Sequence, residues 1–245
     1  MLRYAVGTTS MLLAASAAVA QAPRLREVHR VLPPRYLAAF GGEHVADING
    51  DGLSDVVFGW SAWLRRDDDT FELRHYADFP STGNPMDQAL VDIDGDGDVD
   101  RVIANGPFVG GSGPWNDVIE RNDGNGNFTS LPKIELIGSG GPSTCVAAAD
   151  VNGDGAIDIV VGSEYLGPSP PPQERAFQVF INYGGGVFTL ESARDLWTPA
   201  IRTNGLALVD FDADGDLDLY LANDVRLGNS DRLYENDGAG NFTTV

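Results

Sequence analysis

Short apolar runs alternate with stretches rich in aspartate, asparagine and glycine from about residue 36 to the last residue, 245. The runs are rich in β-branched and aliphatic residues, as in Val56-Val57-Phe58 and Ile159-Val160-Val161. Short runs of this composition that are bounded by turn-forming residues predict buried β-strands. The pattern therefore predicts an all-β fold.

The most regular polar stretch is nine residues long and occurs four times. It reads DIDGDGDVD over Asp92–Asp100, and the other copies are Asp47–Asp55 (DINGDGLSD), Asp150–Asp158 (DVNGDGAID) and Asp210–Asp218 (DFDADGDLD). We call these four stretches the acidic loops and number their positions 1 to 9. Apolar runs lie on both sides of each copy, so each acidic loop is predicted to join two strands.

The spacing of oxygen-bearing side chains in the acidic loops predicts a cation site. Positions 1, 3, 5 and 9 carry Asp or Asn, position 7 would add its backbone carbonyl, and position 6 is always glycine, as a sharp turn requires. Ca2+ takes about 6–8 such oxygens, whereas Mg2+ prefers few carboxylates and retained waters, so Ca2+ is the expected ion, about one per repeat at four sites. The predicted ligands are Asp47, Asn49, Asp51, Leu53, Asp55, Asp92, Asp94, Asp96, Asp98, Asp100, Asp150, Asn152, Asp154, Ala156, Asp158, Asp210, Asp212, Asp214, Asp216 and Asp218.

Two other interpretations of these loops were weighed. Asp, Asn and Gly also form ordinary turns, but turn chemistry does not require an oxygen ligand at every one of these positions in four copies. An EF-hand starts in the same way but needs a glutamate at position 12 and flanking helices. Position 12 here is apolar in every copy: Phe58, Ile103, Val161 and Leu221.

A second signature repeats with the acidic loops. Asn122–Phe128 (NDGNGNF), Asn182–Phe188 (NYGGGVF) and Asn236–Phe242 (NDGAGNF) predict hairpin turns that lead into a further strand, and Arg65–Phe71 keeps only the spacing. Both signatures recur about every 45–60 residues. Four antiparallel strands at that period predict β-propeller blades, with units at about 36–80, 81–138, 139–197 and 198–245.

The beginning of the chain predicts export. Residues 1–20 combine Arg3, an apolar segment and the sequence Ala18-Val19-Ala20, which is typical of a signal peptide cleaved near Ala20. Residues 21–35 form a leader segment, and no later apolar run is long enough to span a bilayer. We therefore expect a secreted protein located outside the cell, at its surface or in the periplasm.

Composition narrows the choice of partners. The net charge is −20, and sixteen of the 36 acidic residues lie in the acidic loops, so much of the acidity is expected to be ligand charge. Such a chain is a poor candidate for binding nucleic acid or anionic membranes. Cys145 is the single cysteine, which excludes an internal disulfide, and its apolar neighbours predict a small core residue.

The acidic loops, the strands around them and the Asn-Asp-Gly-x-Gly-x-Phe turns resemble FG-GAP/VCBS repeats, the calcium-loop blades of integrin-α-type β-propellers. The resemblance covers roughly residues 36–245. It implies one Ca2+ in each blade and an extracellular role in cell adhesion or ligand binding. Family propellers usually have about seven blades, so four repeats indicate an incomplete or open propeller, completed by further blades from a longer chain or by self-association.

Three functions were compared. The leading one is a secreted, calcium-binding module for adhesion to an unidentified protein or glycan, with Phe108, Trp115, Tyr165 and Arg175 as exposed candidates in the variable connections. A propeller lectin is the first alternative, although the four tryptophans do not recur at one position of the repeat. A polysaccharide-degrading enzyme is the second, but His29, His44 and His75 fall in no recognisable catalytic motif, so we expect no enzyme activity.

Overall fold

The computed structural model describes residues 42–76, 84–106, 116–128, 134–136, 142–163, 177–192, 202–224 and 230–245. All of them belong to one compact unit, Ala39–Val245. No helix in these ranges has the length and apolar character needed to cross a membrane. The predicted signal peptide and leader segment lie outside the described residues, as do Phe108, Trp115, Trp197, Tyr165 and Arg175.

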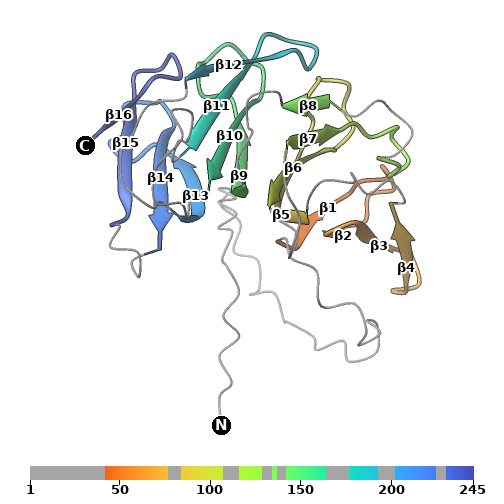
Figure 1. Ribbon diagram of the computed structural model, residues 1–245. Coiled ribbons are helices and arrows are strands. Elements are labelled where there is room, and N and C mark those ends of the chain that lie inside the picture. Colours follow the sequence, from red (N-terminus) through yellow and green to blue (C-terminus); the bar gives the residue numbers. More distant parts are fainter. Residues whose placement is uncertain are drawn as a thin grey trace, which may run out of the picture. The chain divides into compact units, whose positions relative to one another are not determined.

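The described chain consists of sixteen strands in four antiparallel sheets, which confirms the prediction of an all-β repeat fold. Each sheet contains four strands paired in the order of the sequence (Figure 1). The first sheet contains β1 (His44–Ala46), β2 (Asp55–Phe58), β3 (Ser61–Arg65) and β4 (Phe71–His75), and the second contains β5 (Asn84–Val91), β6 (Asp100–Gly106), β7 (Asp117–Glu120) and β8 (Ile134–Leu136). The third contains β9 (Ser143–Ala149), β10 (Asp158–Ser163), β11 (Phe177–Asn182) and β12 (Phe188–Ser192), and the fourth contains β13 (Thr203–Val209), β14 (Asp218–Asn223), β15 (Arg232–Asn236) and β16 (Phe242–Thr244).

The continuous apolar runs form strands that are buried on both faces. In β10, Ile159 and Val161 point into a cluster shared with the second sheet, whereas Val160 between them points into a cluster shared with the fourth. Both faces of the third sheet are thus covered, and this explains why its strands lack the alternation of apolar and polar residues seen in half-exposed sheets. The same arrangement places one apolar cluster between each pair of consecutive sheets.

Contacts between sheets also involve the first strand of each sheet. β1 contacts β5, β5 contacts β9, and β9 contacts β13. In the last three sheets this first strand carries a β-bulge six residues before the acidic loop, at Met86, Thr144 and Asn204. The Thr144 hydroxyl donates a hydrogen bond to the carbonyl of Thr203 in the next sheet. The hydrophobic pattern contained no signal for these bulges, because a bulge adds one residue without changing residue type.

A buried cation lies between the first two sheets. Arg101 of β6 is fully buried, and its Nε donates to Glu120 Oε2 at 3.0 Å while its Nη1 donates to the carbonyl of Gly59 at 3.1 Å. Its guanidinium carbon lies 4.9 Å from the ring centroids of both Tyr76 and Phe128. The charge is therefore paired within an aromatic environment rather than solvated.

Candidate functional site: the acidic loops

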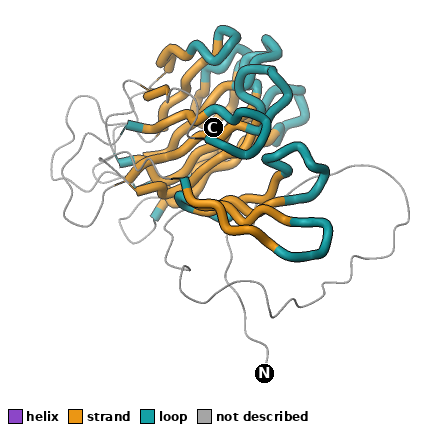
Figure 2. The backbone as a smooth tube through the Cα atoms, turned by 90° about the vertical axis from the view of Figure 1, so that its right-hand side faces the viewer, coloured by secondary structure: helices purple, strands orange, loops and turns teal. Residues whose placement is uncertain are grey.

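The acidic loops and the repeated turns lie at the same end of their sheets. Each acidic loop connects the first and second strands of a sheet, and each turn connects the third and fourth. In an antiparallel sheet with this order, both connections emerge at one end. Figure 2 shows the described loops gathered mainly at one end of the strands.

The side chain at position 1 organises each loop. In the second loop, Asp92 Oδ1 accepts hydrogen bonds from the backbone N–H groups of Gly95 at 2.8 Å and Asp96 at 3.1 Å, and Oδ2 accepts one from Gly97 at 2.9 Å. Asp150 makes the same three contacts in the third loop. The backbone is therefore wrapped around one carboxylate, as in other Asx turns.

Two positions in each loop adopt the left-handed conformation. Position 6 does so at Gly97 (φ 97°), as predicted, but position 4 does so as well, with φ of 71°, 80° and 74° at Gly50, Gly95 and Gly153. The fourth loop has Ala213 at position 4, with φ of 65°. The ligand spacing did not predict this conformation at position 4, although glycine occupies that position in three of the four copies and could have indicated it.

Replacing Ala213 by glycine should stabilise the protein by about 1 kcal/mol, because a side chain in the left-handed region costs about 1–2 kcal/mol, part of which the greater chain entropy of glycine offsets. Chemical denaturation of both proteins measures the change. The matched control is Ala156→Gly in the third loop, which should not stabilise. An Ala213→Gly protein with unchanged or reduced stability would show that position 4 is not strained.

Position 9 connects its acidic loop to the sheet. Asp55, Asp100, Asp158 and Asp218 are all buried at the start of the second strand. In Asp100, Oδ2 accepts the N–H of Ile93 at position 2 (3.1 Å) and Oδ1 accepts the N–H of Asn122, two residues after the third strand (2.7 Å). Burial raises the pKa of Asp100 to about 6, with repulsion from Asp94 and Asp96 adding to it, and burial raises the pKa of Asp55 and Asp158 as well.

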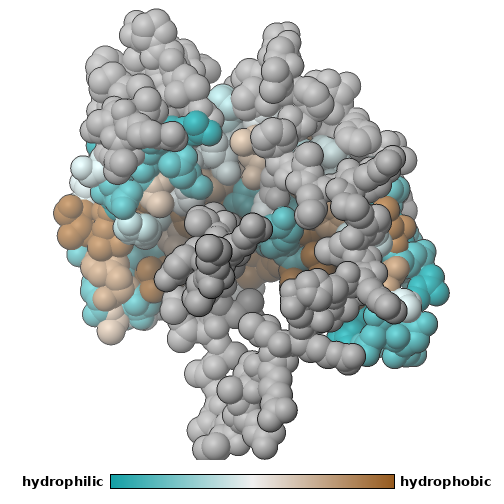
Figure 3. Space-filling model, turned by 90° about the horizontal axis from the view of Figure 1, so that it is seen from below, coloured by the Kyte–Doolittle hydropathy of each residue, from teal (hydrophilic) through white to brown (hydrophobic). Residues whose placement is uncertain are grey.

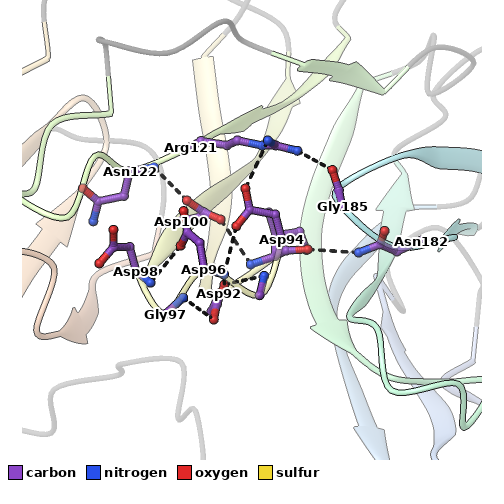
Figure 4. Close-up of polar contacts among 12 residues, drawn as sticks. Asp92, Asp94, Asp96, Gly97, Asp98, Asp100, Arg121, Asn122, Asn182 and Gly185 are labelled. Carbon is purple, nitrogen blue, oxygen red and sulfur yellow. Dashed lines mark hydrogen bonds and ion pairs between the residues drawn. The ribbon is translucent and has the colours of Figure 1, made fainter.

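The loop fold brings three of the predicted ligands together in two loops. One oxygen each of Asp92, Asp94 and Asp100 lie within 4.8 Å of one another, and the same holds for Asp210, Asp212 and Asp218. These are positions 1, 3 and 9, and Figure 4 shows the second loop. The first and third loops have Asn49 and Asn152 at position 3, so an amide oxygen takes the place of the second carboxylate there.

The other two predicted ligand positions are placed differently. The position-5 carboxylates lie outside the three-carboxylate groups of the described loops. Asp96 Oδ1 instead accepts the N–H of Asp98 at 2.9 Å, and Asp51, Asp154 and Asp214 make the equivalent contact. The position-7 carbonyls of Leu53, Asp98, Ala156 and Asp216 stay predicted ligands.

The raised pKa of Asp100 predicts how the metal-free chain responds to pH. A carboxyl group whose folded pKa exceeds its unfolded value of 3.8 stabilises the fold when protonated, and this contribution is lost as pH rises through about 6. The metal-free chain should therefore melt at a higher temperature at pH 5 than at pH 7.5. Calorimetry in metal-stripped buffer measures this, and Asp100→Asn should weaken the dependence; a metal-free chain most stable above pH 7 would contradict it.

Arg121 is a site residue that sequence reasoning missed. Its Nη1 lies 3.1 Å from Asp94 Oδ2, and its Nη2 donates to the carbonyl of Gly185, in the turn of the third sheet, at 2.7 Å (Figure 4). It thus pairs with one of the three grouped carboxylates and connects the second loop to the next sheet. No sequence signal distinguished it, because an arginine after a strand is common.

The asparagine that opens each repeated turn has more than a turn role. Its side-chain amide donates to the position-2 carbonyl of the preceding sheet's loop: Asn122 to Ile48 (2.7 Å), Asn182 to Ile93 (3.0 Å) and Asn236 to Val151 (2.7 Å). The same amides donate to the position-8 carbonyl of their own loop. We call Asn122, Asn182 and Asn236 the clamp asparagines, because each connects the acidic loops of two consecutive sheets.

Comparison with known proteins identifies one repeat family. Residues 108–161 match the FG-GAP-like repeat, a span that contains β7, β8, β9, the third acidic loop and most of β10. The matched span therefore takes strands from two consecutive sheets and includes the clamp asparagine Asn122. This agrees in part with the resemblance inferred from the sequence.

The comparison with curated proteins found no match. Among solved structures, the chain is similar to the biofilm matrix protein Bap1 of V. cholerae, with 18% sequence identity and a TM-score of 0.40. The similarity covers 84% of this chain and 39% of that one, so the chain spans less than half the length of Bap1.

Proposed function

We propose that the chain is a secreted, calcium-binding β-propeller repeat protein that acts as an adhesion or ligand-binding module. The observation that carries the calcium site is the group of three carboxylates at positions 1, 3 and 9 of the second and fourth loops. Three carboxylates this close repel one another, and a divalent cation removes that repulsion while accepting the oxygen ligands it prefers. The position-5 carboxylate and the position-7 carbonyl would complete the ligand set.

The loop residues show how binding would stabilise the fold. Position 9 starts the second strand and holds both position 2 and the end of the third strand through its two oxygens, as Asp158 does with Val151 and Asn182. An ion held by the same carboxylate would connect loop, strand and turn. Stabilisation of this kind would suit an exported chain without disulfides, because a ligand that binds only the folded state adds its binding free energy to folding.

Propeller blades are the arrangement we propose for the four sheets. The supporting observations are the four consecutive four-stranded meanders, the contacts among first strands, and an apolar cluster between each pair of consecutive sheets. The predicted signal peptide and the FG-GAP-like repeat support an extracellular role. The partner would be an extracellular protein or glycan.

The ligand sets predict two classes of calcium site. The second and fourth loops have carboxylates at positions 1, 3, 5 and 9, whereas the first and third have asparagine at position 3. The second and fourth loops should therefore bind more tightly, because affinity follows ligand charge. Calorimetric titration of residues 21–245 should give four sites in two classes. Asp92→Asn should remove one tight site. Asp67→Asn changes an exposed residue outside the loops with the same loss of charge, and it should remove no site. A titration that shows no heat of binding would reject the calcium assignment.

Two alternatives have specific tests. For a lectin, Trp63 is buried, and Trp60 is half-buried with the Arg101 guanidinium 5.7 Å from its ring centroid, which disfavours sugar stacking on these two rings; a glycan array would decide. For an enzyme, Ser61 Oγ lies 2.9 Å from His75 Nδ1, the spacing of a nucleophile and its base. Turnover in a polysaccharide or ester panel would favour the enzyme if Ser61→Ala abolished it. Burial raises the pKa of the Cys145 thiol to about 12, which argues against a cysteine nucleophile.

A further inference from the structure

The position-2 residue of the fourth acidic loop is exposed, unlike its three counterparts. Ile48, Ile93 and Val151 are 1–2% exposed, whereas Phe211 is 39% exposed. Phe211 belongs to the same repeat and its N–H is bonded in the same way, to Asp218 Oδ2 at 3.1 Å. The difference therefore lies in what covers the residue rather than in the conformation of its loop.

In the first three loops, the next sheet covers position 2 by a repeated set of contacts. The clamp asparagine bonds the position-2 carbonyl at all three interfaces, and at the first and third loops a left-handed glycine four residues later also packs against the position-2 side chain. A Cβ on Gly126 would lie 3.4 Å from Ile48, and one on Gly240 would lie 3.6 Å from Val151. The amide bond of the clamp asparagine is thus the contact that all three interfaces share.

Two further residues on the outward face of the fourth sheet are apolar, although Glu235, which matches the buried Ile181 of the third sheet, is charged and exposed. Tyr220 occupies the place that Val160 has in the third sheet, ten residues after the start of the loop, where Val160 is fully buried against the fourth sheet. Tyr220 is 38% exposed and Val209 is 44% exposed. Figure 3 shows hydrophobic surface on the left of the view, the side on which Figure 1 draws the fourth sheet.

We propose that this face, formed by Val209, Phe211 and Tyr220, docks a further four-stranded sheet whose third strand ends in a clamp asparagine. The molecule already forms this kind of interface three times. In a fourth interface, the side-chain amide of the incoming clamp asparagine would donate to the Phe211 carbonyl. The first sheet of a second copy lacks the required group. Its Arg65 donates its backbone N–H to Asp55 Oδ1, as a clamp asparagine would, but it has no side-chain amide, and its guanidinium is paired with Asp69.

A gain-of-contact experiment tests this docking surface. A duplicate of residues 193–245 is appended after Val245, which places a counterpart of Asn236 where a fifth sheet would present it. Hydrogen exchange of the peptide spanning residues 209–217 should slow at least tenfold relative to the unextended chain, with a monomeric mass. In a matched extension the counterpart of Asn236 is replaced by arginine, the residue of the first sheet, and exchange should stay fast.

Three results would overturn the proposal. One is unchanged exchange in the extended chain, because a single sheet of this size folds only against a neighbour. Another is equal slowing in the asparagine and arginine extensions. The last is slowed exchange in the unextended chain on self-association, which would make a second copy the occupant. Phe211→Asp in the extended chain should restore fast exchange.

Discussion

Adding 10 mM Ca2+ to the metal-free chain should raise its free energy of unfolding by roughly 6 kcal/mol or more. Extracellular calcium modules often bind at about 10⁻⁴–10⁻³ M, so each of four sites would add about 1.4–2.7 kcal/mol at that concentration. For a chain of this size the melting temperature should rise by at least about 12 °C. Thermal unfolding of residues 21–245 with Ca2+ and with EGTA measures the effect.

The control for this experiment separates bound ions from general charge screening. The net charge of −20 means that any salt could relieve some repulsion. Sodium chloride at matched ionic strength should therefore raise the melting temperature far less than Ca2+. An equal response to both salts would contradict specific sites. Asp210→Asn should reduce the calcium response by one site's share, and Asp67→Asn should leave it unchanged.

Replacing Arg101 by alanine should lower the free energy of unfolding by about 3–5 kcal/mol, because it leaves Glu120 buried without its cation. The substitution also removes the guanidinium that packs against the Tyr76 and Phe128 rings and takes away the Arg101 donor to the Gly59 carbonyl. Urea denaturation in saturating Ca2+ measures the loss independently of the metal sites.

The exposed ion pair of Arg66 and Glu72 provides the matched control, and Arg66→Ala should cost less than about 1 kcal/mol. The double variant Arg101→Met, Glu120→Leu should be more stable than Arg101→Ala, because it leaves no unpaired charge in the interface. A loss below 1 kcal/mol for Arg101→Ala would mean that water reaches Glu120 between the first two sheets.

Local chemistry explains why so much of the fold could be predicted. Val160 and its neighbours form a short apolar run bounded by Asp and Gly, and such a run forms a strand whichever strands it pairs with. The left-handed turn at Gly97 depends only on the absence of a Cβ. The grouping of Asp92 with Asp94 also follows from loop spacing, because both are held within one tight turn.

Long-range contacts explain the features that were missed. Arg121 meets Gly185 across 64 residues, and Asn182 meets Ile93 across 89, and neither separation leaves a periodic trace in the sequence. The role of the clamp asparagines was hidden because the same Asn-x-Gly pattern is sufficient for a turn by itself. Arg101 resembled any charged residue beside an acidic loop, although it is fully buried.

The sequence by itself determined the strands, the acidic loops and their candidate ligands, since hydrophobic period, turn chemistry and ligand spacing act over a few neighbouring residues. Only the tertiary structure decided that position 9 rather than position 5 joins positions 1 and 3, which charge is buried and which apolar face is left uncovered. Ile48 and Phe211 occupy the same place in their loops, yet one is buried and the other exposed. The physical reason is that burial depends on the neighbouring sheet, which local sequence does not specify.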